Sequence, residues 1–186
     1  MVTTAPAPAS GVRANGLASG QRAPELDLPA TPDGRRIKLA DHRDSPVVLV
    51  FYPGDFTPVC TSELGLFNEL LPELGGMGAK VFGISCDSIW AHFAYARELN
   101  LQLPLLSDFH PKGEASRRYQ VYRDDIGTCE RALVAIDGRG VILWSEVAPL
   151  EVNPGADGVI EALEQMTGKS LDFSEQSEHL RHEARS

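Results

Sequence analysis

The sequence predicts an α/β domain with one mixed sheet, which has a parallel centre, antiparallel hairpins at its edges and helices on both faces. Two continuous apolar runs, at 45–53 and 80–85, are each followed by a segment with apolar residues at helical spacing. Strands that alternate with helices form parallel sheets covered on both faces. Pairs of short apolar runs joined by turns, at 24–41 and 131–147, predict the antiparallel hairpins.

Each element has a local cause. The dipeptide Asp33-Gly34 favours the tight turn of a hairpin. The run at 45–53 is β-branched and aromatic, as in strands buried on both faces. Leucines at helical spacing predict one helix over 59–74, and the glycines that follow it should end that helix.

A second helix is expected over 89–100, with Asp87 or Ser88 as its N-cap. Shorter elements complete the domain: a strand at 103–108, a short helix at 110–121, the hairpin at 131–147 and a last helix at 155–167.

Length and charge narrow the class of protein. A chain of 186 residues suits one domain with a real core, assigned here to 20–168. The formal charge of −9 argues against a nucleic-acid or anionic-membrane partner. No apolar run approaches the ~18 residues that span a bilayer. Residues 1–19, rich in Ala, Pro, Ser and Gly, predict a disordered tail, with an organellar transit peptide as the alternative. Residues 169–186 form a polar C-terminal tail.

Three cysteines are too few, and odd in number, for a secreted disulfide framework, which favours a reducing, cytoplasmic location. No Cys or His pair has zinc-ligand spacing, so neither a metal nor another cofactor is expected. The five histidines lie in polar contexts and are expected at the solvated surface: His42, His92, His110, His179 and His182.

Cys60 is the candidate nucleophile. It follows a buried strand where a helix begins, and Pro58 suits the first turn of that helix. Free backbone amides and the helix dipole at such a position favour a thiolate. Thr57 lies within reach for a hydrogen bond to the sulfur or to a substrate oxygen. The plainer alternative is a small buried hydrophobe, as free cysteines often are.

Pro53, Thr57 and Cys60, in PGDFTPVC, match the Pro-x-x-x-Thr-x-x-Cys pattern of the peroxiredoxins, the alkyl hydroperoxide reductase and thiol-specific antioxidant superfamily. The resemblance extends over about 20–167. Within it, the segment ERALVAIDGRGVILW resembles the strand pair that carries the family's active-site arginine, which falls on Arg131.

The resemblance implies a thioredoxin-like fold and a thiol-dependent peroxidase that reduces hydrogen peroxide and organic hydroperoxides. Cys60 would attack the O–O bond as a thiolate and become a sulfenic acid. Arg131 would stabilise the thiolate and the developing oxygen charge. Thr57 would bind the peroxide, Pro53 would shield the sulfur, and Glu63 would hold the arginine in place.

Three routes for reducing the sulfenic acid stay open. Cys86 directly follows the strand at 80–85, which should lie beside the strand that precedes Cys60. Cys129 stands two residues before Arg131, so strand alternation should place both on one face. The third route is a one-cysteine mechanism with an external reductant, a thioredoxin-like protein or a low-molecular-weight thiol. The family resemblance also implies a homodimer, with a higher oligomer as the alternative.

Two other functions compete on the same fold. A thiol-disulfide exchange protein needs Cys-x-x-Cys, but residues 60–63 read Cys-Thr-Ser-Glu and lack the second thiol. A redox-sensing or chaperone-like binding protein without catalysis would not need the motif residues, which are all present.

Overall fold

A strand buried along its whole length organises the fold. The computed structural model describes residues 16–169. In it, β3 (Val47–Phe51) pairs in parallel with β4 (Lys80–Ser85) and antiparallel with β8 (Arg131–Ile136). The outer strands are β5 (Leu105–Ser107) next to β4, and β9 (Ile142–Ala148) next to β8. The mixed sheet predicted from the apolar runs is confirmed.

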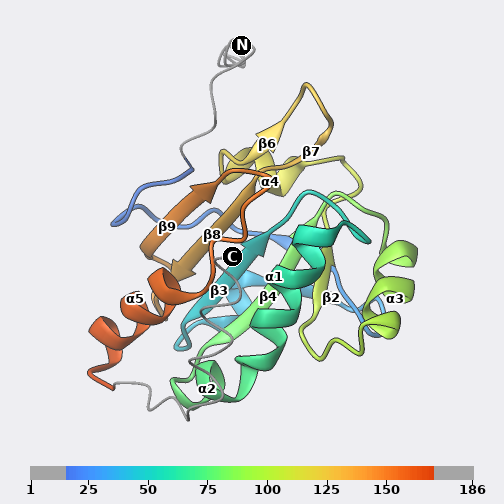
Figure 1. Cartoon of the computed structure of the whole chain (residues 1–186). Coiled ribbons are helices and arrows are strands. Elements are labelled where there is room, and N and C mark those ends of the chain that lie inside the picture. The colour runs from blue at the N-terminus through green and yellow to red at the C-terminus, as the bar shows by residue number, and fades with distance from the viewer. Residues whose placement is uncertain (1–15, 170–186) are drawn as a thin grey trace, which may run out of the picture.

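The two faces of the sheet carry separate apolar cores, because successive residues of a strand point to opposite faces. Val48 and Val50 of β3 face α1 (Pro58–Glu69), and α5 (Asp157–Thr167) packs on this same face (Figure 1). Val47, Leu49 and Phe51 face the other way. There the N-terminal segments and α4 (Glu114–Arg118) cover the sheet.

The helix expected over 59–74 is interrupted. Helix α1 ends at Glu69, and α2 (Leu71–Gly76) starts anew after Leu70. Pro72 explains the break, since it has no N–H to donate within a continuous helix and its ring crowds the preceding turn. Helix α3 (Ile89–Glu98) forms as predicted, and the Ser88 side chain caps it by accepting a hydrogen bond from Ala91 N at 3.3 Å.

Both predicted hairpins are antiparallel, but only β8–β9 belongs to the central sheet. The first hairpin forms a separate two-stranded sheet, next to β5 through the isolated bridge between Ala30 and Leu106. Strand β1 (Asp27–Pro29) pairs with β2 (Arg36–Lys38), followed by a 3₁₀ turn, η1 (Leu39–His42), and β8 pairs with β9. The sequence did not predict a further two-stranded hairpin, formed by β6 (Tyr122–Arg123) and β7 (Thr128–Cys129). Figure 1 shows it near the start of β8.

The packed part of the chain begins before residue 20, where the domain boundary was predicted. Leu17 belongs to the apolar core, and its carbonyl oxygen accepts a hydrogen bond from the Ser145 hydroxyl. Predictions about residues 1–15 and 170–186 lie outside the described residues. Within 16–169, no helix is both long and apolar enough to cross a membrane.

Candidate active site

Cys60 lies in the first turn of α1, immediately beyond the carboxyl end of β3. Thr57 is the N-cap with extended backbone, and Pro58 is the first helical residue. Thr61 N donates to Thr57 O at 2.9 Å, so the amides of Val59 and Cys60 precede the first hydrogen bond within the helix. Cys60 is fully buried, and its amide belongs to the positive end of the helix dipole.

Arg131 meets the sulfur from β8. Its Nη2 lies 3.4 Å from Cys60 Sγ, and its Nη1 donates to Glu63 Oε2. Nε and Nη2 also donate to Leu150 O, at 3.1 and 2.8 Å. The guanidinium is 1% exposed, so α1, β8 and the segment after β9 fix a buried cation beside the thiol. Such a cation is a partner for a thiolate and for an oxyanion.

Glu63 sits beside this cation at a high electrostatic cost. Burial raises the pKa of the Glu63 carboxyl to about 7, although the charge of Arg131 and its hydrogen bond act in the opposite direction. Glu63 Oε1 has no hydrogen-bond partner among the residues described. For Arg131, burial acts to lower the pKa, but the charges of Glu63 and Cys60 outweigh it and raise the pKa. The arginine therefore stays charged.

The loop before Cys60 is held by a buried polar network. Asp55 Oδ1 accepts from Tyr52 OH at 2.8 Å, and Asp55 Oδ2 lies 2.8 Å from His92 Nδ1. Asp55 N donates to Asp87 Oδ2 at 2.9 Å. The expectation that His92 lies at the surface is wrong, because its ring is fully buried on α3 between Asp55 and Leu106 O.

Thr57 and Pro53 line this same loop. Thr57 Oγ1 donates to Gly54 O at 3.0 Å, and no hydrogen bond among the described residues joins it to Cys60. Thr57 is exposed and Pro53 is half-buried. Their roles beside the buried thiol stay predictions. Phe56, between them, has a φ of 60°, a strained backbone for a bulky residue.

Cys86 and Cys129 pack in the core on the opposite face of the sheet from Cys60. The expectation that alternation turns Cys129 toward Arg131 is wrong, because β7 pairs with β6 outside the central sheet and Glu130 interrupts the chain between β7 and β8. The two sulfurs lie 3.6 Å from each other. A resolving role for either one stays a prediction, and no described contact brings them to Cys60.

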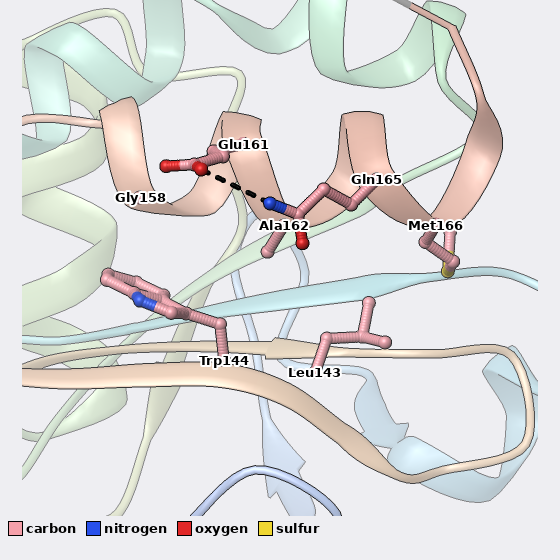
Figure 2. A pocket seen from close by; sticks show the side chains of 7 residues that line it. All are labelled: Leu143, Trp144, Gly158, Glu161, Ala162, Gln165 and Met166. Carbon is pink, nitrogen blue, oxygen red and sulfur yellow. Dashed lines mark hydrogen bonds between the residues drawn. The ribbon is translucent and has the colours of Figure 1, made fainter.

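A separate pocket of about 390 Å³ lies between β9 and α5 (Figure 2). Trp144 and Leu143 form its floor, and Glu161 and Gln165 of α5 are joined across its rim by a 3.2 Å hydrogen bond. It contains neither Cys60 nor Arg131. Over residues 16–169, no group of three or more His, Cys, Asp or Glu is placed to hold a metal ion.

A buried cysteine at a helix N-terminus, paired with a buried arginine at the start of an interior strand of a thioredoxin-like sheet, defines a thiol-dependent redox enzyme. Residues 19–145 match the model of the AhpC/TSA family, and the chain belongs to that family, the peroxiredoxins. This confirms the resemblance seen in the sequence and establishes a thiol-dependent peroxidase.

Relatives and solved structures agree. The chain is 34% identical to peroxiredoxin-2 of Bos taurus over 154 residues, covering 78% of this chain and 76% of the relative. It is 29% identical to peroxiredoxin 2 of Thermoplasma acidophilum over 161 residues, covering 83% and 76%. The structure of Mycobacterium tuberculosis AhpC superposes with a TM-score of 0.73 at 28% identity, covering 84% of this chain and 96% of that chain. The structure of reduced Plasmodium vivax 2-Cys peroxiredoxin superposes with a TM-score of 0.72 at 26% identity, covering 84% of this chain and 88% of that chain.

Proposed function

We propose that the protein reduces hydrogen peroxide and organic hydroperoxides through a sulfenic acid on Cys60. The observation that carries this proposal is the 3.4 Å contact between Arg131 Nη2 and Cys60 Sγ at the start of α1. A thiolate beside a fixed cation can attack an electrophilic oxygen, and the same cation can stabilise the oxygen that leaves.

In the proposed step, the Cys60 thiolate forms an S–O bond and the O–O bond breaks. The leaving oxygen takes a proton and departs as water or an alcohol, while the sulfur becomes the sulfenic acid. Arg131 faces the developing charge. Thr57 and Pro53 would orient the peroxide and limit water at the sulfur, and Glu63 would hold the guanidinium in its position.

The sulfenic acid then needs a thiol. We favour an external one, a thioredoxin-like protein or a low-molecular-weight thiol, because Cys86 and Cys129 pack on the other face of the sheet. The first external thiol forms a mixed disulfide with Cys60 and releases water. A second thiol releases Cys60 and leaves as the disulfide. A homodimer and a cytoplasmic location remain predictions.

Trapping tests this proposal. Reduced protein is treated with one equivalent of hydrogen peroxide in the presence of dimedone, then digested with trypsin. Each cysteine falls in its own peptide, with Cys60 in residues 44–80. We expect the dimedone adduct on that peptide. An adduct confined to Cys86 or Cys129 would refute the assignment of Cys60.

A further inference from the structure

We propose that Cys86 and Cys129 form a second redox centre, a dithiol that exchanges with external disulfides and closes reversibly into an intramolecular disulfide. This centre is independent of Cys60. A dithiol usually has its two cysteines at Cys-x-x-Cys spacing, which this sequence lacks. Here the fold brings together two cysteines that are 43 residues apart in the chain.

The two sulfur atoms are in direct non-bonded contact. The two sulfur atoms lie 3.6 Å apart and both thiols are free. Bond formation requires an approach of about 1.5 Å, which side-chain rotation and small backbone shifts can supply. Cys86 follows β4 directly, and Cys129 ends the two-residue strand β7, so neither sulfur is held within a long regular element.

The two sulfurs have unequal surroundings. Cys129 is fully buried, whereas Cys86 is 5% exposed. Ser116 Oγ lies 3.0 Å from Cys129 Sγ and donates to Asp108 Oδ2 at 2.7 Å. The hydrogen bond between the thiols raises the pKa of Cys129, as does its burial, and lowers that of Cys86. Cys86 is thus the more reactive and more accessible thiol. Cys129 is the buried thiol that attacks the mixed disulfide on Cys86.

The β6–β7 hairpin, which carries Cys129 and packs Tyr122 against the core that holds both cysteines, is a weak element. Tyr122, which lies opposite Cys129 in the β6–β7 hairpin, packs its ring onto Gly113, where an added Cβ would come within 2.1 Å of it. The Arg117 guanidinium stacks 4.0 Å from the centre of the ring. Two-residue strands outside the main sheet open at low free-energy cost, which gives an external disulfide access to Cys86.

The exchange balances without any further reactant. The Cys86 thiolate attacks one sulfur of an external disulfide, forms a mixed disulfide and releases one thiolate. Cys129 gives its proton to the released thiolate and attacks Cys86 Sγ, which releases the second thiolate. That thiolate takes up the proton that Cys86 lost to the solvent. The external disulfide is reduced by two electrons to two thiols, and the Cys86–Cys129 pair is oxidised to a disulfide.

Peptide mapping of a Cys60→Ser variant, checked for folding by circular dichroism, tests the proposal. The protein is equilibrated with reduced and oxidised dithiothreitol at a series of ratios. Free thiols are then alkylated, and the protein is digested with trypsin without reduction. We expect residues 81–97 and 124–131 to be recovered as one disulfide-linked species, with a mass lower by two hydrogens than the two free peptides. Excess dithiothreitol should return both to the alkylated form.

Two comparisons make the result decisive. The Cys60→Ser, Cys129→Ser double variant should show no intramolecular link. Wild-type protein, mapped in the same buffers, should give the same 81–97 to 124–131 link and leave the Cys60 peptide unlinked. Full alkylation of Cys86 and Cys129 at every ratio in folded protein would overturn the proposal, as would a link from Cys60 to either one. Since peroxide is absent, neither outcome depends on the peroxidase mechanism.

Discussion

Arg131 and Glu63 form an ion pair in which both side chains are buried almost completely, 1% and 0% exposed. The same guanidinium contacts Cys60 Sγ through its other terminal nitrogen. One cation therefore contacts both a buried carboxyl group and the sulfur of the candidate nucleophile. Burying two ions costs free energy, so we expect this ion pair to lower the stability of the fold.

Replacing Arg131 by Met should slow the reaction of reduced protein with hydrogen peroxide by about a hundredfold or more, because a positioned charge at the reacting oxygens is lost. Stopped-flow measurement of the second-order rate constant checks this. Arg131→Lys is the matched control, since it keeps the charge but not the fork that binds Glu63 and Leu150, and it should recover only part of the rate. An unchanged rate in the Met variant would remove the electrostatic role of Arg131.

The Glu63 carboxyl should make stability depend on pH. Its pKa is about 7 in the folded protein and ordinary, near 4.5, when unfolded. A raised pKa means that the contribution of Glu63 to stability is fully present below pH 4.5 and is lost as the pH rises through 7. The Glu63→Gln variant mimics the protonated form. Its free energy of unfolding relative to wild type should therefore rise by up to about 3 kcal/mol between pH 5 and pH 8.

Urea unfolding of both proteins at several pH values measures this difference. A constant difference across the range would show that the carboxyl does not titrate there.

The network around Asp55 should position the loop that carries Thr57. Asp55→Asn weakens the contacts to His92 and Tyr52 and should lower the free energy of unfolding by about 1–3 kcal/mol, because buried polar partners are left unsatisfied. Tyr52→Phe removes one hydrogen bond and should cost about 1 kcal/mol. The peroxide rate should fall with Asp55→Asn more than with Tyr52→Phe. Equal, wild-type rates would show that the network only stabilises the fold.

Gly158 should be intolerant of a side chain. A Cβ there would lie 2.3 Å from Trp144 Cζ2, so Gly158→Ala should destabilise the protein by about 1–3 kcal/mol through overpacking of α5 on β9. Gly65→Ala is the control, because its Cβ meets nothing within 4 Å in helix α1, and it should stabilise by about 0.5–1 kcal/mol. Thermal unfolding compares the two, and a destabilised Gly65→Ala variant would undermine this packing argument.

The sequence indicated the sheet because the apolar run at 47–51 has no alternation, which only a doubly buried strand explains. It indicated Cys60 through its strand-to-helix position, and Arg131 through the family resemblance. The burial of His92 was not predicted, because its helix has both polar and apolar residues. Its partner, the Asp55 carboxylate, is 37 residues away in the sequence.

The contact between Cys86 and Cys129 could not be predicted from the sequence for a related reason. Alternation along one continuous strand would have put Cys129 on the face of Arg131. The short β6–β7 hairpin, too brief to leave an apolar pattern, turns Cys129 into the other core instead. Contacts of this kind depend on where one strand ends and the next begins, and the periodicity of the sequence does not show this.

The most direct test of the role of Cys60 is peroxide consumption by reduced protein, compared with that of the Cys60→Ser variant under the same conditions. We expect rapid consumption by the parent and loss of that consumption in the variant. If the folded variant consumed hydrogen peroxide as fast as the parent, Cys60 would not be the peroxide-reducing residue.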